Sequence, residues 1–112
     1  MKLVFICSPY AGDIEVNTIK AKEFCRWAYL YKNVNVFAPH LFYTQFLQEY
    51  IPRERRIGIS LGMQMLKKCD EMWVFGTEIS KGMGQEIEAA RLLKIPVIFR
   101  GAEYWKDANE KG

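Results

Sequence analysis

The chain has 112 residues, half of them hydrophobic and 26% charged. This length allows one domain with a substantial core and is too short for two, and the 14% of aromatic residues argues against a disordered chain. The net charge is +3 with basic residues scattered among acidic ones, which argues against a nucleic-acid polymer as partner and suits a small anionic ligand.

The three cysteines, Cys7, Cys25 and Cys69, lie far apart and lack the spacing of a metal site. We interpret them as reduced thiols and expect neither a metal nor a cofactor. The first residues run directly into an apolar stretch that is too short for a signal peptide, and no apolar run approaches the length of a membrane span. We therefore expect a soluble, cytoplasmic protein without a membrane partner.

The first half of the chain predicts two strands and a helix. An apolar strand at Lys2–Cys7 leads into the turn-rich loop Ser8–Asp13. A helix is predicted at 17–32, because apolar residues recur there every three or four positions. Val34–Phe37 predicts the second strand, and the aromatic stretch after it predicts a loop with a short helix at about 42–48.

The second half continues the alternation, with a helix at 52–68, a strand at 71–75, a helix at 82–94, a strand at 96–99 and a short final helix at 103–107. Strands that alternate with helices through short loops indicate a parallel sheet with helices on both faces. We therefore predict an α/β fold, a flavodoxin- or Rossmann-like three-layer sandwich with a mostly parallel sheet of four to five strands.

In such sheets, ligands bind beyond the carboxyl ends of the strands, where the strand order reverses. Three predicted loops lie at that edge, at residues 8–13, 38–43 and 76–84. Their groups able to contact a nucleotide are Ser8, Tyr10, Gly12, His40, Tyr43, Ser80, Gly82 and Gly84.

The segment from Ser80 to Glu86 carries the strongest functional signal. Two glycines let the backbone approach a ligand, and a helix that begins near Gly82 directs unpaired N–H groups at it, as a sugar-phosphate requires. Glu86 is expected in the first turn, where the helix dipole favours an ionised carboxylate that attacks an electrophilic carbon. The alternative is an ordinary helix start with Ser80 as its N-cap.

Three sequence features together resemble the nucleoside 2-deoxyribosyltransferase superfamily, with 2'-deoxynucleoside 5'-monophosphate N-glycosidases as the nearest likeness. They are the strand ending in Ser8-Pro9-Tyr10, Asp70 directly before another apolar strand, and the pattern Ser80-x-Gly82-x-Gly84-x-Glu86. The resemblance implies a single deoxyribosyltransferase-like domain over residues 1–112. It also implies hydrolysis or transfer of a deoxyribosyl group from a small-molecule nucleoside or nucleotide, without a cofactor, by a homo-oligomer.

The resemblance assigns roles to individual residues. Glu86 is the implied nucleophile at C1', Asp70 the acid that protonates the departing base, and Tyr10 a third catalytic residue beside the sugar or base. By analogy with O-glycoside hydrolysis, the two carboxyl groups should lie about 5 Å apart. The implied substrate- and phosphate-binding residues are Ser8, Pro9, Gly12, His40, Ser80, Gly82, Met83 and Gly84. Serine at position 80 favours a 5'-phosphorylated substrate, because its hydroxyl can donate to a phosphate. Structural alternatives remain for three of these residues. Asp70 could cap or break the helix that ends at Lys68, Tyr10 could belong to the core, and His40 could have a structural role.

Two departures from the family pattern leave a second hypothesis open. The first loop lacks the arginine that the hydrolases place beside the phosphate, and Arg26, Arg53 or Lys81 could replace it. Glu88 stands where family members commonly have glycine, and a helix directs it away from Glu86. The alternative function is therefore a catalytically inactive module that senses or sequesters a nucleotide-like ligand.

Two further features bear on binding and assembly. The basic cluster Arg53, Arg55 and Arg56 around Glu54 is interpreted as a solvated helix start, with phosphate binding as the alternative. The aromatic segment 42–50 is the expected contact between subunits.

Overall fold

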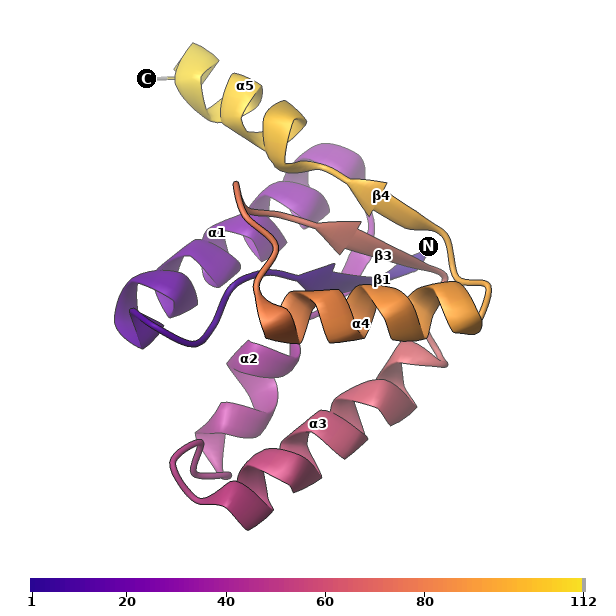
Figure 1. Ribbon diagram of the computed structural model, residues 1–112. Coiled ribbons are helices and arrows are strands. Elements are labelled where there is room, and N and C mark those ends of the chain that lie inside the picture. The colour runs from indigo at the N-terminus through magenta and orange to yellow at the C-terminus, as the bar shows by residue number, and fades with distance from the viewer. Residues whose placement is uncertain (112) are drawn as a thin grey trace.

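The computed structural model describes residues 1–111 and the side chains of residues 1–110. Its four strands form one sheet in the order β2-β1-β3-β4, and every neighbouring pair is parallel (Figure 1). The strands are β1 (Leu3–Cys7), β2 (Asn35–Phe37), β3 (Glu71–Val74) and β4 (Val97–Phe99). The predicted α/β fold with a parallel sheet is thereby confirmed.

The strand order determines where a ligand site can form. β1 lies between β2 and β3, with Leu3 opposite Asn35 and Cys7 opposite Val74. This order begins the flavodoxin-like pattern, in which the direction of winding reverses between β1 and β3. The crevice for a ligand is therefore expected just beyond Cys7 and Val74.

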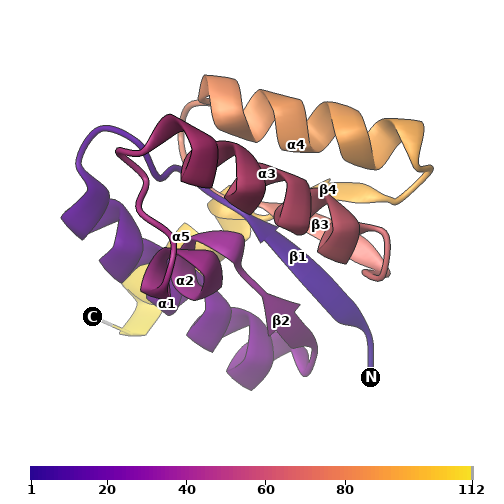
Figure 2. The same ribbon diagram turned by 90° about the horizontal axis from the view of Figure 1, so that it is seen from below.

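The helices cover both faces of the sheet, as the alternating pattern predicts. Figure 2 shows α1 and α5 on one face and α3 and α4 on the other. The helices are α1 (Ile14–Lys32), α2 (Pro39–Phe42), α3 (Pro52–Leu66), α4 (Lys81–Leu92) and α5 (Gly101–Lys111), with a 3-10 turn η1 (Tyr43–Gln45) after α2. Within residues 1–111, no helix combines the length and the apolar character that crossing a membrane requires.

The core has two halves because side chains alternate along the buried strands. On β3, Trp73 faces the core beneath α1 and α5, while Met72 and Val74 face the core beneath α3 and α4. All four residues of β3 are buried, which agrees with the apolar run in the sequence. The sheet thus positions its carboxyl-end loops on a rigid, fully packed platform.

The last helix is longer than the five residues predicted for it, because tertiary contacts hold it. Tyr104 is buried and its ring meets Phe24 edge to face at a centroid distance of 4.9 Å. Its hydroxyl donates to Glu23 at 3.0 Å, and the Trp27 Nε1–H donates to Asp107 at 2.8 Å. These contacts tie α5 to α1.

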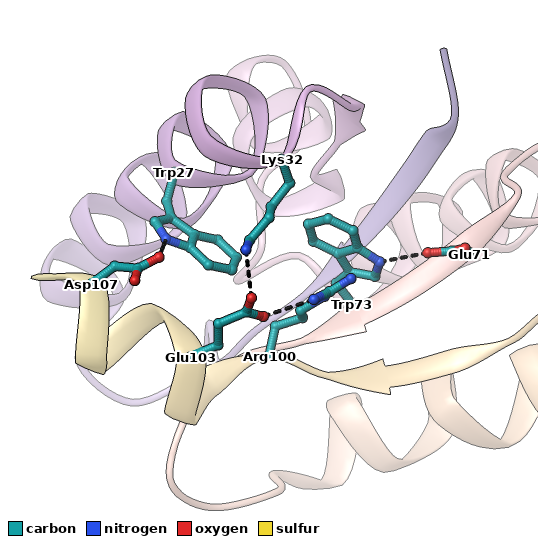
Figure 3. A network of polar contacts seen from close by, with 7 residues as sticks. All are labelled: Trp27, Lys32, Glu71, Trp73, Arg100, Glu103 and Asp107. Carbon is teal, nitrogen blue, oxygen red and sulfur yellow. Dashed lines mark hydrogen bonds and ion pairs between the residues drawn. The ribbon is translucent and has the colours of Figure 1, made fainter.

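Charged groups extend this link beside the sheet (Figure 3). Glu103 pairs with both Lys32 and Arg100, and the Arg100 guanidinium lies over the Trp73 ring at 4.2 Å from its centroid. The Trp73 Nε1–H donates to Glu71 at 2.8 Å. The face of the sheet opposite α4 is therefore occupied by internal contacts.

Candidate active site

A cavity of about 660 Å³ lies at the carboxyl ends of β1 and β3. Its walls come from the first loop, the segment from α2 to α3, the inner face of α3 and the start of α4. This is the place that the strand order indicates for a ligand. Of the residues expected at the site, the cavity is lined by Ser8, Tyr10, His40, Tyr43, Ser80, Gly82, Met83 and Glu86.

Glu86 is the ionisable group that the fold shields most strongly in this cavity. The residue as a whole is half-buried, but its Oε1 is closed off from water and has no hydrogen-bond partner. Burial raises the pKa of this carboxyl to about 7, and the neighbouring Cys7 thiol acts in the opposite direction. Glu86 therefore changes its charge near neutral pH.

The predicted position of Glu86 in the first helical turn is wrong. The helix α4 begins at Lys81 with Ser80 as its N-cap, so Glu86 lies in the second turn. The influence of the helix dipole falls off beyond the first turn, and removal from water then dominates the pKa.

Tyr10 and His40 form an aromatic wall of the cavity. Their rings stack with centroids 4.6 Å apart and planes inclined by 16°. Burial lowers the pKa of His40 to about 4, so its imidazole is neutral near pH 7. Burial, followed by the charge of Glu49, raises the pKa of Tyr10, so its phenol stays protonated. The wall therefore offers flat, uncharged surfaces to a planar ligand.

The loop that carries Tyr10 is held in place from behind. The side-chain amide of Asn17 donates to the carbonyl oxygens of Tyr10 at 3.0 Å and of Ala11 at 3.3 Å. Pro9 packs against Gly76, which has φ of 111°, and a Cβ at Gly76 would lie 3.2 Å from the Pro9 Cδ. Pro9 therefore supports the wall from outside the cavity lining.

The start of α4 contributes polar groups to the same cavity. The Ser80 Oγ accepts a hydrogen bond from the Met83 N–H at 3.2 Å, so the N-cap alternative for Ser80 is confirmed. A Cβ added at Gly82 would meet no atom within 4 Å. Lys81 also lines the cavity and makes no ion pair within residues 1–110. The helix start is thus open to an anion.

Two arginines reach the cavity from α3. Arg56 makes no ion pair with any described side chain, whereas the Arg55 Nε lies 3.5 Å from Glu49. Arg53 lies outside the lining and is exposed, as a solvated helix start predicts, and Arg26 is also outside it. All three arginines are exposed, as the solvated helix start predicts, and the place of Arg55 and Arg56 in the cavity lining leaves the phosphate-binding alternative open for these two.

Asp70 does not reach this cavity. It precedes β3, is exposed, and its Oδ2 accepts a hydrogen bond from the Leu3 N–H at 2.8 Å. The strand β1 separates Leu3 from Cys7, which lies beneath Glu86, by about 13 Å at 3.3 Å per residue. The expected meeting of Asp70 and Glu86 is therefore wrong, because residues before a parallel strand lie at the opposite end of the sheet.

Other expected site residues also lie outside the cavity lining, namely Pro9, Gly12 and Gly84. Glu88 is exposed and outside the lining, as its helical offset from Glu86 predicts. Among residues 1–111, no group of three or more His, Cys, Asp and Glu residues could hold a metal ion.

Comparison with known proteins identifies both a family and a fold. A model of a domain of unknown function, DUF7768, matches residues 2–100, while no curated protein matches. The solved structure of a 2-deoxyribosyltransferase from the psychrotolerant bacterium Bacillus psychrosaccharolyticus is similar, with a TM-score of 0.64 and 17% identity. The alignment covers 87% of this chain and 70% of that one. That enzyme is described as a biocatalyst for the synthesis of antiviral and antitumoral nucleosides.

At this identity the likeness concerns the fold, and it agrees with the predicted deoxyribosyltransferase-like α/β architecture. The family match spans nearly all of the described residues. The chain therefore belongs to the family of the domain of unknown function DUF7768.

Proposed function

We propose that this protein cleaves the N-glycosidic bond of a 2'-deoxynucleoside or its 5'-monophosphate through a covalent glycosyl-Glu86 intermediate. The observation that carries the proposal is a carboxylate shielded from water in a cavity of about 660 Å³ that also holds an aromatic wall and unpaired cations. The similarity of the fold to a 2-deoxyribosyltransferase supports it. In this proposal the whole chain forms one deoxyribosyltransferase-like domain.

Glu86 acts as the nucleophile when it is ionised. Its carboxylate forms a bond to C1' while the electron pair of the C1'–N bond leaves with the base. Water, or a second base in a transferase, then attacks C1' and releases the carboxylate. With a pKa of about 7, roughly half of the molecules hold the reactive form at pH 7. Removal from water makes that form more nucleophilic than a solvated carboxylate.

The leaving base is stabilised by the aromatic wall. A purine or pyrimidine ring stacks on the side of the wall that faces the cavity, and the protonated phenol of Tyr10 donates a hydrogen bond to the departing nitrogen. Asp70 has no part in this step, because it lies at the far end of the sheet.

A 5'-phosphate is the substrate group that best explains the polar end of the cavity. Arg56 and Lys81 supply positive charge that no described carboxylate neutralises, and the Ser80 hydroxyl can donate to a phosphate oxygen while its lone pair caps the helix. Ser8, which is 2% exposed and lines the cavity, contributes a further hydroxyl.

The test is release of free base, measured by chromatography, from a panel of deoxynucleosides and their 5'-monophosphates. We expect release by the wild-type protein and none by Glu86→Gln. The matched control is Glu88→Gln, which removes an exposed carboxylate two residues away on the same helix and should retain activity. Release by Glu86→Gln at the wild-type rate would refute the assignment of the nucleophile.

A second candidate function has its own support. Asp70, the carboxylate expected to protonate the leaving base, lies outside the cavity. A cavity that holds Glu86 without this acid also suits a module that binds a nucleotide and does not cleave it. Calorimetric titration separates the two functions. Tight binding of a deoxynucleotide that stays intact over hours supports the binding module.

We also propose that the chain forms a homo-oligomer through the segment 42–50. Phe42, Phe46 and Tyr50 are 53%, 57% and 80% exposed, and Tyr50 belongs to the cavity wall. A second copy that covers these rings would bury apolar surface and close the cavity. Sedimentation should then show a dimer or larger species, and a monomer at micromolar concentration would contradict this.

A further inference from the structure

We propose that Glu54 is a positioning residue for substrate binding, which fixes the cavity lining at residues 47–50 by accepting a hydrogen bond from the Gln48 N–H. The effect on a substrate rests on the proposed function of the cavity. The contact itself joins the loop before α3 to the first turn of that helix, and it can be measured without any turnover.

The lining segment 47–50 has no helix or strand of its own. All four of its residues line the cavity, and they lie between η1 and α3. The Leu47 N–H donates to the Tyr43 carbonyl at 2.8 Å, which fixes the beginning of the segment. The rest of the segment therefore depends on its contacts with the start of α3.

Glu54 supplies the shortest polar contact between the described side chains of α3 and this segment. Its Oε1 accepts the hydrogen bond from the Gln48 N–H at 2.9 Å, and the Ile51 N–H donates to the Gln48 carbonyl at 3.1 Å. Both backbone polar groups of Gln48 are therefore occupied. The second polar contact is the ion pair of Glu49 with Arg55 at 3.5 Å, whose side chains are 37% and 60% exposed, so this pair contributes little.

The place of Glu54 in α3 explains why its side chain reaches the loop. It is the third residue after the N-cap Ile51, and a glutamate at this place commonly turns back toward the residues before its helix. A carboxylate in the first turn also interacts favourably with the helix dipole. Glu54 can therefore act through its hydrogen bond to the lining segment or through its charge, and the two roles require different side chains.

The lining segment lies within electrostatic reach of the phenol that is proposed to donate to the departing base. Burial, and after it the charge of Glu49, raises the pKa of Tyr10. A segment released from Glu54 would lose its place beside the ligand, whereas Glu86 is held on a different helix, α4. The expected defect is therefore in substrate binding rather than in the chemical step.

Three substitutions separate the hydrogen bond from the charge. Glu54→Gln keeps an acceptor oxygen at the same reach and loses the charge, so the KM for a deoxynucleoside 5'-monophosphate should stay within about twofold of the wild-type value. Glu54→Asp keeps the charge but is one methylene shorter, and Glu54→Ala keeps neither the charge nor the acceptor. Both should raise this KM about fivefold and change kcat by less than about twofold, because one hydrogen bond contributes a factor of about 2–10. A role of the charge alone predicts the opposite order, with Glu54→Asp like the wild type and Glu54→Gln like Glu54→Ala.

The contact itself is measured by hydrogen–deuterium exchange of the Gln48 amide, followed by NMR. This amide should exchange about tenfold faster in Glu54→Asp and Glu54→Ala than in the wild type and Glu54→Gln. The control is Glu15→Ala, which removes an exposed carboxylate from the first turn of α1, outside the cavity lining. It should leave the KM and the Gln48 exchange unchanged. Circular dichroism checks that each variant folds.

Slow exchange of the Gln48 amide in Glu54→Asp overturns the inference, and so does a KM that rises as much in Glu54→Gln as in Glu54→Ala. Faster exchange without a change in KM also overturns it, because the segment then does not position the substrate. Where no base is released, the dissociation constant of the 5'-monophosphate from calorimetric titration replaces the KM. The expected order of these constants then supports the inference and refutes the proposed cleavage, whereas a protein that neither binds nor cleaves any of the substrates refutes both.

Discussion

The shielding of Glu86 predicts that the carboxylate destabilises the folded protein above neutral pH. A raised pKa means that the folded protein keeps this proton to higher pH than the unfolded chain, so the free energy of unfolding falls as the pH rises from about 4.5 to about 7. Between pH 5 and pH 8 the expected loss from Glu86 is about 2.5 kcal/mol, at 1.36 kcal/mol per pKa unit.

The assay compares wild type and Glu86→Gln by urea denaturation at pH 5 and at pH 8. Glutamine has nearly the same shape as glutamate and does not ionise. Any effect of the substitution on packing or hydrogen bonding therefore changes the free energy of unfolding equally at both pH values. Relative to Glu86→Gln, the wild-type midpoint should fall by about 1–2 M urea on going from pH 5 to pH 8. His40 titrates in the opposite sense but is present in both proteins, and its contribution cancels. An equal stability difference at the two pH values would show that Glu86 is not desolvated.

Three further predictions concern single side chains. Arg56→Ala should raise the KM for a deoxynucleoside 5'-monophosphate about tenfold, because a charge-assisted contact contributes about 1.5–3 kcal/mol. Arg53→Ala is the control, because Arg53 lies outside the cavity lining and its substitution should leave this KM unchanged. Equal KM changes for the two variants in steady-state kinetics would argue against the phosphate site. Because the pKa of His40 is lowered, the free energy of unfolding of the wild type should fall by about 2 kcal/mol from pH 7 to pH 5 relative to that of His40→Gln. An equal pH dependence of the two denaturation midpoints would contradict this. Gly76→Ala should destabilise the protein by about 1–3 kcal/mol, because its φ is positive and the new Cβ meets Pro9, and an unchanged melting temperature would disprove that strain.

The overall fold could be predicted because both kinds of element leave strong local patterns. The run ending at Cys7 is apolar on every residue, as a strand with helices on both faces must be, and the periodicity up to Lys32 marks the helix that covers it. The length of α5 could not be predicted in this way. Its extension depends on contacts of Tyr104 and Asp107 with α1, which are distant in sequence.

The candidate site was predictable to the extent that strand direction determines it. Ser8, Tyr10, His40 and Ser80 all follow strands, so the carboxyl edge of the sheet gathers them. Asp70 precedes its strand, and a resemblance in local sequence placed it at the wrong edge.

The remaining errors concern tertiary environment. Burial rather than the dipole controls Glu86, because α4 packs its second turn over Cys7. The place of Arg56 in the cavity lining depends on how α3 is rotated about its own axis, which the pattern of charges at its start does not reveal.

The link between α5 and α1 has a consequence for how the chain is synthesised. Trp27 and Asp107 are 80 residues apart, so the ribosome must release nearly the whole domain before this bond can form. Until then, Phe24 and Trp27 on α1 lack the aromatic neighbour that Tyr104 supplies. The nascent chain therefore exposes apolar aromatic surface on α1 during translation, and the docking of α5 on α1 completes folding.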